Sequence, residues 1–369
     1  MGKTIRCSKE ISASMKEDKY TKVVIPPYFS FAFSNKESID LAKMPWLNPQ
    51  KIDTKNAFHS CFNLKSVNIQ GFDNLDSKDM SYMFFNCNKL KNLDLRDLRT
   101  DGVVDMSNMF RGCSNLQSIN FGTGFDTLKV TDMSYMFSGC SSLTSLDVSK
   151  FDTSSVTNMM HTFLGCGSLR ELDLSEWNVR KVTQFGNTLI SKTGMFHGCR
   201  NLVTIKFGKN FEPPTDANFA GMFRDCMNLQ LIDLSSWGYL KTSIDKYEAM
   251  FKNCSALTEI KGSYIISFSS TSKSSSLNEM FYGCRALTSL DLRSLIRSDS
   301  QSLILKNTFA GCLSLKHLDI SNIAGKNTTI TGAFTDVPDD CEILVNDEVM
   351  KTKIETAYSN LTNVKVKGA

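Results

Sequence analysis

Residues 130–154 read VTDMSYMFSGCSSLTSLDVSKFDTS, and most of this pattern returns in residues 156–177. In both stretches a Phe is followed three residues later by a Cys, and a Leu comes three residues after the Cys. The same three positions recur ten times along the 369 residues, at intervals of 26 to 33 residues. The Phe residues at this position are Phe58, Phe84, Phe110, Phe137, Phe163, Phe196, Phe223, Phe251, Phe281 and Phe309. Ten of the twelve cysteines therefore occupy one position of a repeat.

Each Leu after the Cys begins the pattern Leu-x-x-Leu-x-Leu, as in Leu90, Leu93 and Leu95. With a period of about 20 to 29 residues, this ladder is the leucine-rich repeat signature, in which each repeat adds one short strand to a parallel sheet. One repeat cannot bury its own Leu, Phe, Met and Cys side chains. Neighbours on both sides cover them, which is favourable at about 25 cal/mol per Å² of apolar area. The sequence therefore predicts a solenoid.

Two further segments of the repeat predict how the strands are connected. Residues 132–140 (DMSYMFSGC) place a polar residue before apolar residues at helical spacing, which predicts one or two helical turns. Residues 151–157 (FDTSSVT) place an apolar side chain before residues that close turns. We therefore expect an α/β leucine-rich-repeat solenoid with a parallel sheet on its concave side. Short helices or turns should lie on the convex side, and there should be about ten repeats plus terminal caps.

The regular pattern sets the expected boundaries. We expect an N-terminal cap in residues 1–43, the solenoid in residues 44–336 and a C-terminal cap in residues 337–369. A cap is needed at each end because an open solenoid end exposes apolar surface. The two longest intervals contain KVTQFGNTLISKTGMF (residues 181–196) and SFSSTSKSSS (residues 267–276), which we predict to be surface loops.

Charge and hydropathy narrow the possible functions. The 42 basic residues nearly balance the 38 acidic ones, which argues against nucleic acid as the partner. No run of about 18 apolar residues occurs, so we expect no insertion into a membrane. The first 20 residues lack the apolar core of a signal peptide. These observations leave a cell-surface or secreted protein whose signal was removed and a cytoplasmic protein as alternatives.

The cysteines and histidines do not form a recognisable reactive site. Cysteines at one repeat position lie side by side at about 4.8 Å per strand, whereas zinc needs ligands that converge from several directions. We interpret them as a buried column, and only Cys7 and Cys341 as candidates for exposure. The four histidines show no catalytic motif, and Gly-rich phosphate loops are absent. We therefore expect no enzyme activity, no metal site and no cofactor.

The outward positions of the predicted strands are the candidate binding residues, because alternation places them in columns on the concave face. The predicted partner-binding residues are Asp94, Arg96, Asn120, Asp147, Glu171, Asp173, Lys206, Asp233, Lys261, Asp291, Arg293 and Asp319. Carboxylates stacked at strand spacing repel one another, so neighbouring groups or a partner must compensate them. Two interpretations stay open at this point. Either each Asp bonds a nearby Ser or backbone amide of its own repeat, or the column contacts a partner.

The repeat of residues 130–154 resembles the BspA-like leucine-rich repeat proteins, in the subgroup that combines Met-Phe-x-Gly-Cys with Leu-Asp-Leu-Ser. The resemblance covers roughly residues 44–345. It implies a surface protein with a role in adhesion and partner binding. We therefore predict a non-catalytic recognition protein that binds a protein or a glycan through the concave sheet and adjoining loops. An intracellular scaffold for protein assembly is the alternative.

Overall fold

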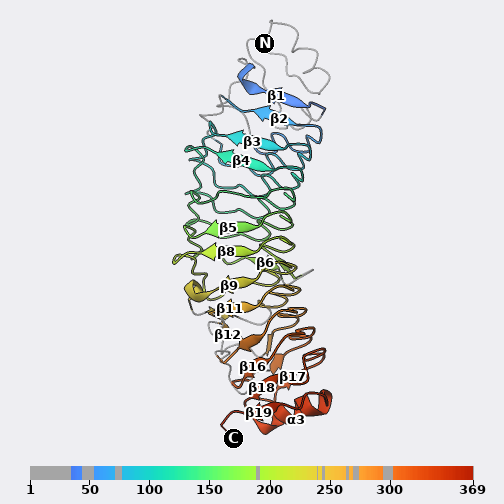
Figure 1. Ribbon diagram of the computed structural model, residues 1–369. Helices are drawn as coiled ribbons and strands as arrows, with labels where there is room; N and C mark the ends of the chain where they lie inside the picture. The colour runs from blue at the N-terminus through green and yellow to red at the C-terminus, as the bar shows by residue number, and fades with distance from the viewer. Residues whose placement is uncertain are drawn as a thin grey trace. The chain divides into compact units, whose positions relative to one another are not determined.

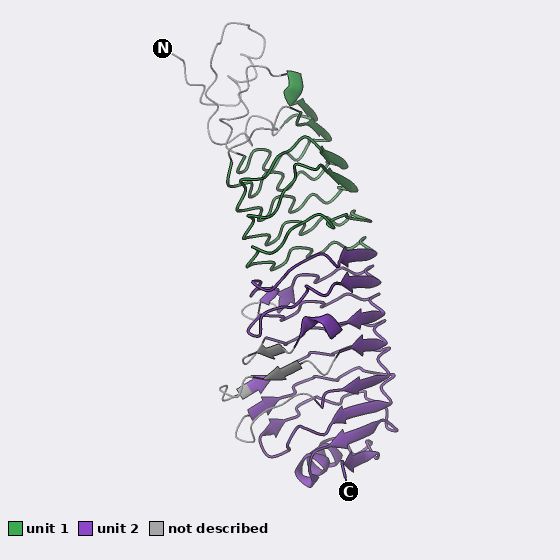
Figure 2. Cartoon of the chain, turned by 90° about the vertical axis from the view of Figure 1, so that its left-hand side faces the viewer, with its two compact units in different colours: residues 1–169 green, residues 170–369 purple. Residues whose placement is uncertain are grey.

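The computed structural model describes residues 35–43, 54–70, 77–187, 192–238, 240–242, 246–262, 266–268, 274–293 and 302–368. The chain divides into two compact units (Figure 2), unit 1 with residues 1–169 and unit 2 with residues 170–369. Each unit is built from short coils, and within a unit most strands of successive coils lie along one side (Figure 2). This is the predicted parallel-sheet solenoid, although it contains little helix.

Unit 1 contains strands that pair in parallel, β1 with β2 and β3 with β4 (Figure 1). The elements are β1 Ser38–Asp40, the 3-10 turn η1 Leu41–Lys43, β2 Ser66–Asn68, β3 Asn92–Leu95 and β4 Ser118–Phe121. In the β3–β4 pair Leu93 lies opposite Ile119, and Asp94 lies opposite Asn120. Equivalent repeat positions are therefore neighbours in space, which aligns each residue type into a column.

Unit 2 places most of its strands in the same parallel arrangement, and one sheet has four strands in the order β14-β16-β18-β19. The strands that lie along the same side of unit 2 are β5 Glu171–Leu174, β8 Thr204–Phe207, β9 Leu231–Asp233, β11 Glu259–Lys261, β14 Ser289–Asp291, β16 His317–Ile320, β18 Glu342–Val345 and β19 Val364–Val366. Further parallel pairs join β10 Leu240–Thr242 to β12 Ile266–Phe268, and β13 Ser274–Ser276 to β15 Ser302–Ile304 and β17 Thr328–Thr329. The 3-10 turn η3 Ser235–Trp237 follows β9.

Tight turns replace the helical turns predicted for the Met-x-x-Met-Phe segment. Phe137 lies between two residues with left-handed backbone, Tyr135 at φ 57° and Gly139 at φ 75°. An α-helix needs a negative φ at every residue, so this pair prevents one. The same two left-handed positions flank nine of the ten repeat Phe residues. The Phe137 N–H donates to Thr162 O of the next coil at 2.8 Å, so the turns still satisfy their backbone groups.

The repeat Phe side chains form the centre of each core. In unit 1 the rings of Phe58, Phe84, Phe110, Phe137 and Phe163 stack with centroids 5.1 to 5.8 Å apart. In unit 2 the rings from Phe196 to Phe309 stack at 5.4 to 6.1 Å. All ten rings are fully buried. Stacking in register lets each coil cover the apolar face of the next.

The predicted column of buried cysteines is confirmed, and the structure adds a role for it. Cys140 Sγ donates to the carbonyl oxygen of Phe110 in the preceding coil at 3.1 Å. The same Phe110 oxygen also accepts the N–H of Cys113 within its own coil. Eight of the column cysteines make this bond to the coil before them, at 3.0 to 3.3 Å. The thiol therefore satisfies the second lone pair of a buried carbonyl.

Cysteine burial also extends beyond the column. Cys341, which the sequence left as a candidate for exposure, is fully buried. Burial raises the pKa of the Cys61, Cys312 and Cys341 thiols to about 12. These groups therefore stay protonated at neutral pH and are poor nucleophiles. Cys7 lies outside the described residues.

The predicted loops and the C-terminal end have their own local structure. Residues 181–196 form the antiparallel pair β6 Gly186–Asn187 and β7 Thr193–Gly194, while residues 188–191 lie outside the described part. Residues 269–273 of the second predicted loop also lie outside the described residues.

The α-helix α3 Glu348–Ala357 is capped at its N-terminus by Asp347, which accepts the Met350 N–H at 2.8 Å. Met350 and Ile354 bury their side chains beside β18 and β19. Across the described ranges, no helix has the length and apolar character needed to cross a membrane.

Candidate binding surface

The outward side of the strands in each unit, here called the strand face, carries the predicted binding residues. In β3 the side chains of Leu93 and Leu95 are buried, while those of Asn92 and Asp94 are exposed. The predicted residues with exposed side chains are Asp94, Arg96, Asn120, Asp147, Glu171, Asp173, Lys206, Asp233, Lys261 and Arg293. Asp291 is half-buried and Asp319 is buried. Strand alternation therefore places all but the last on an open surface of their own unit.

The outward residue between the last two apolar positions of Leu-x-x-Leu-x-Leu forms a column along the strand face, called the middle column here. Each Asp of this column closes a turn of its own coil. The Asp173 Oδ1 accepts the N–H of Ser175, two residues later, at 2.9 Å. Asp94, Asp147, Asp233, Asp291 and Asp319 accept the N–H two residues later in the same way, at 2.9 to 3.2 Å. Asn68 makes the same bond to Gln70 at 3.0 Å. One carboxylate oxygen therefore belongs to the architecture of the repeat, and a side-chain amide can replace it there.

The second carboxylate oxygen binds basic side chains. Asp94 is paired with Arg96, whose Nη2 lies 2.7 Å from Oδ2. The Asp173 Oδ2 accepts Lys206 Nζ at 3.0 Å. Lys206 lies opposite Asp173 in the β5–β8 register, and Lys261 lies opposite Asp233 in the β9–β11 register. Acidic and basic residues therefore alternate at this position from β5 to β11, which relieves the repulsion expected for a column of carboxylates.

These contacts lower the pKa values of five of the column carboxyls. The hydroxyl of Ser175, its backbone N–H and Lys206 together lower the pKa of Asp173 to about 2. Arg96 lowers the pKa of Asp94, and Arg293 lowers that of Asp291. The hydroxyls of Ser149 and Ser235 lower the pKa values of Asp147 and Asp233. These carboxylates are therefore ionised at neutral pH.

Asp319 differs from the rest of its column because its side chain is buried beneath basic side chains that are themselves partly exposed. Its side chain is only 6% exposed, and Arg293 Nε lies 3.4 Å from its Oδ2. Lys367, just after β19, lies 3.7 Å from the same oxygen. Next to it, His317 Nδ1 lies 3.0 Å from Glu342 Oε2. This end of the strand face is occupied by the chain's own side chains.

The sequence interpretation missed a second acidic column, on the turn side of unit 1. Asp79, Asp105 and Asp132 pair with one another through parallel bridges in successive coils. Each accepts an N–H two residues later, as Asp132 does from Ser134 at 2.7 Å. The signal was present, because an Asp precedes Met80, Met106 and Met133 at repeat spacing. Asp132 is the polar residue that the sequence analysis placed before a helical turn, whereas it closes a tight turn of its own.

A stripe of aromatic and basic side chains on the same side was also missed. The ring of His59 stacks on Phe85 at 4.7 Å, and the Arg111 guanidinium lies 4.5 Å from the centre of the Tyr135 ring. Tyr135 in turn contacts the ring of His161 at 4.6 Å. These side chains cover one another's faces between neighbouring coils. The stripe therefore stabilises the stacking of unit 1.

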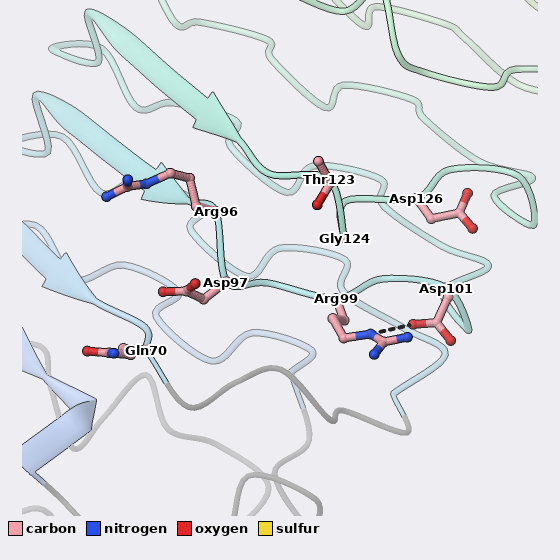
Figure 3. A pocket seen from close by; sticks show the side chains of 8 residues that line it. All are labelled: Gln70, Arg96, Asp97, Arg99, Asp101, Thr123, Gly124 and Asp126. Carbon is pink, nitrogen blue, oxygen red and sulfur yellow. Dashed lines mark ion pairs between the residues drawn. The ribbon is translucent and has the colours of Figure 1, made fainter.

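A polar pocket lies beside the strand face of unit 1 and is called the corner pocket here (Figure 3). It has a volume of about 620 Å³ and is lined by Gln70, Arg96, Asp97, Arg99, Asp101, Thr123, Gly124 and Asp126. Arg99 Nε lies 3.5 Å from Asp101 Oδ1 within it (Figure 3). Unit 2 has a smaller pocket of about 280 Å³ at Arg180, Glu212 and Trp237. There Arg180 donates to Glu212 through both Nε and Nη2.

Among the described ranges, no group of three His, Cys, Asp or Glu residues could hold a metal ion.

The in-register strands, the stacked Phe and Cys columns and the recurrent turns define a leucine-rich repeat protein. Residues 186–321 and 248–366 match the family described as BspA type Leucine rich repeat region. Residues 29–121, 52–144 and 114–204 match a family described as Mycoplasma protein of unknown function. The chain belongs to the BspA-like leucine-rich repeat proteins, as its motifs predict.

Two solved structures are similar along most of their length. A leucine-rich repeat protein from Bacteroides ovatus is 16% identical, covers 93% of this chain and 87% of its own, and has a TM-score of 0.45. A leucine rich cell surface protein from Faecalibacterium prausnitzii is 19% identical, covers 96% and 86%, and has a TM-score of 0.35. None of the curated proteins compared with this chain matched it.

Proposed function

We propose that this protein is a non-catalytic recognition protein that binds a protein or glycan partner through the strand face and its adjoining loops. One observation carries the proposal. One oxygen of each column carboxylate maintains the coil, while the partners of the other oxygen and the exposed flanking side chains differ between coils. A constant scaffold with a variable polar surface is how repeat proteins obtain specificity. Membership of the BspA-like family supports an adhesin-like role at the cell surface or in secreted form.

The proposal includes the finer organisation predicted from the sequence. It assigns an α/β array of ten repeats, from Phe58 to Phe309, to a solenoid in residues 44–336. Residues 1–43 and 337–369 are its caps. No catalytic residue is proposed on the strand face. The column carboxyls of Asp147 and Asp173 have lowered pKa values, whereas a general acid at neutral pH needs a raised one.

The test removes the charge of the column and keeps its turns. Asp147→Asn, Asp173→Asn, Asp233→Asn and Asp291→Asn are combined in one variant, because Asn retains the Oδ1 acceptor, as Asn68 does. Wild type and variant are used to capture partners from host and self lysates, and the recovered molecules are quantified. We expect recovery of the wild-type partner to fall by about tenfold or more, which corresponds to about 1.4 kcal/mol.

A matched control carries the same chemistry on the turn side. Asp105→Asn and Asp132→Asn also retain a turn-closing Oδ1, because Asp105 accepts the Ser107 N–H at 2.8 Å. This double variant should capture the partner as the wild type does. Undiminished capture by the strand-face variant, shown to be folded by circular dichroism, would exclude the strand face as the binding surface.

An intracellular scaffold for protein assembly is the second candidate function. All eleven described cysteines are buried and none of them forms a disulfide, which is compatible with a reducing compartment. Fractionation of native cells separates the two candidates. Recovery of the protein with the surface or secreted fraction supports the adhesin-like role, whereas recovery from the cytosol alone supports the scaffold.

A further inference from the structure

The corner pocket of unit 1 is formed where three successive coils leave the strand face (Figure 3). Gln70 follows β2, residues 96–101 follow β3, and residues 123–126 follow β4. The coil that contains β4 has one residue more than its neighbours at this point. Five steps separate Asn120 from Phe125, compared with four from Asp94 to Leu98.

The extra residue gives the pocket a wall of backbone. A Cβ on Gly122 would lie 2.1 Å from the Arg96 carbonyl oxygen, so this position requires glycine. A Cβ on Gly124 would lie 3.1 Å from Arg99 Cγ. The loop after β4 therefore packs directly on the coil before it. Thr123, between the two glycines, is exposed.

The charged groups of the pocket are of both signs. Arg99 pairs with Asp101 at 3.5 Å, and Arg96 pairs with Asp94 on the strand face. The Asp126 Oδ1 accepts the Leu128 N–H at 2.8 Å. Asp97 makes no ion pair or hydrogen bond with the part of the chain that the structure describes, and Figure 3 shows its carboxylate apart from the Arg99–Asp101 pair.

This arrangement selects against ionic ligands. An anion would meet the carboxylates of Asp97, Asp101 and Asp126, and a cation would meet two guanidinium groups. A neutral hydroxyl group can donate to the carboxylates and accept from the guanidinium groups. The amide of Gln70 and the hydroxyl of Thr123 add one donor–acceptor group each. A volume of about 620 Å³ is within the range of ligand pockets, but the polar lining does not suit an apolar ligand.

We propose that the corner pocket binds one sugar unit of a neutral glycan. The proposal rests on the recognition function proposed above, and it narrows the partner of unit 1 to an uncharged polyhydroxylated chain. The pocket is shallow, since the side chains of Arg96 and Arg99 are 68% and 56% exposed. A single sugar therefore binds weakly, and a repeating glycan gains affinity when several copies of the protein, each with one pocket, bind it side by side on a surface.

The experiment measures binding of the full chain to immobilised neutral polysaccharides, namely mannan, laminarin, galactan and amylose, with hyaluronan as the acidic comparison. Thr123→Trp fills the pocket from an exposed position. Lys209→Trp is the matched control, because Lys209 occupies the same place in the Phe-Gly-x-x-Phe stretch of residues 207–211 in unit 2. We expect wild type to bind at least one neutral polysaccharide, Thr123→Trp to bind about tenfold more weakly, and Lys209→Trp to bind within about twofold of wild type.

A second variant covers the case in which Thr123→Trp fails to fold. Asp97→Ala removes an exposed carboxylate that makes no bond to the described residues, and it should also weaken binding several-fold. Binding that survives both changes, or that Lys209→Trp abolishes equally, would overturn the proposal. Wild type that binds no neutral polysaccharide but captures a protein through the strand face would also overturn it, while the recognition function would stand. Loss only in the strand-face Asn variant would place the sugar on the strand face and not in the pocket.

Discussion

Asp173 shows how one side chain can serve the fold and the surface together. Its Oδ1 accepts the backbone N–H of Ser175 at 2.9 Å, and its Oδ2 accepts Lys206 Nζ at 3.0 Å. The first bond fixes the chain as it leaves β5, and the second joins two neighbouring coils. Because these bonds favour the ionised form, they lower the pKa of Asp173 from 3.8 to about 2.

The pKa shift makes a prediction about acid stability. A carboxyl group with a lowered pKa in the folded state adds stability above its unfolded pKa of 3.8 and loses it as the pH falls through about 2. The thermal midpoint of the wild type should therefore fall more steeply across this range than that of Asp173→Asn. Solvent screens this half-exposed group, so the gap at neutral pH should be about 1 °C. Parallel midpoint curves for the two proteins would show that Asp173 does not contribute in this way.

The turn that contains the repeat Phe is the element that gives each coil its tight shape. Its two left-handed residues, Tyr135 and Gly139 in the example above, lie four positions apart, and none of the three residues between them has a positive φ. Along this segment successive N–H groups point alternately within the coil and toward the next coil. The Met136 N–H bonds Met133 O inside the coil, and the Phe137 N–H bonds Thr162 O across to the next one. The element thus buries Phe and Cys without an α-helix.

Substitution of Gly139 tests the left-handed position. Gly139 has φ 75°, and an added Cβ would meet nothing closer than 3.5 Å, so backbone conformation alone sets the cost. Gly139→Ala should lower the free energy of unfolding by about 1 to 2 kcal/mol, measured by urea denaturation. Gly139→Asn should cost less, because Asn tolerates this conformation and Asn86 and Asn253 adopt it at the same repeat position.

Gly167 supplies the control for this measurement. It lies close to the turn but has no positive φ, and an added Cβ would meet nothing closer than 4.0 Å. Gly167→Ala should leave stability unchanged or raise it slightly. Equal destabilisation by Gly139→Ala and Gly167→Ala would show that the left-handed geometry is not the cause.

At the scale of the whole molecule, each unit keeps its reactive sulfur inside. The ten column cysteines are fully buried, and burial raises the pKa of Cys61 and Cys312 to about 12. A thiol must be ionised and accessible to react with an alkylating reagent. The folded chain therefore protects these thiols in two ways: burial keeps the reagent away, and the raised pKa keeps the thiols protonated.

Alkylation with iodoacetamide measures this protection. In the folded protein at neutral pH we expect the cysteines from Cys61 to Cys312 to stay unmodified, as read by peptide mass spectrometry. After denaturation all ten should react. Modification of a column cysteine in the folded protein, at a rate close to that of the denatured chain, would contradict the buried arrangement.

The sequence allowed much of this architecture to be predicted, because its signals are periodic. The spacing of Phe137, Cys140 and Leu143 marks inward positions, and strand alternation correctly placed Asp173 and Lys206 on an open face. The turn around Phe137 was predicted as helical because the spacing of its apolar residues fits a helix equally well. The φ of Tyr135 decides between the two, and Tyr gives no sign of a left-handed conformation.

The sequence could not be used to predict which charged side chains pair or where the pockets lie. The two interpretations of the Asp column could be separated only by seeing that Oδ1 of Asp94 or Asp147 closes a turn. The burial of Asp319 depends on Arg293 and on Lys367, which is 48 residues further along the chain. The corner pocket depends on one additional residue near Gly122, whose effect appears only when that loop packs on the coil before it.

The bond from each column thiol to a Phe carbonyl has a direction, and that direction bears on how the array is assembled. Cys113 donates to Phe84, and Cys140 donates to Phe110, so the later coil always supplies the hydrogen to the earlier one. A ribosome releases the earlier coil first. Each emerging coil within a unit thus completes a carbonyl of the coil made before it, whereas backbone N–H groups of that earlier coil, such as that of Phe137, gain their acceptor only when the next coil arrives.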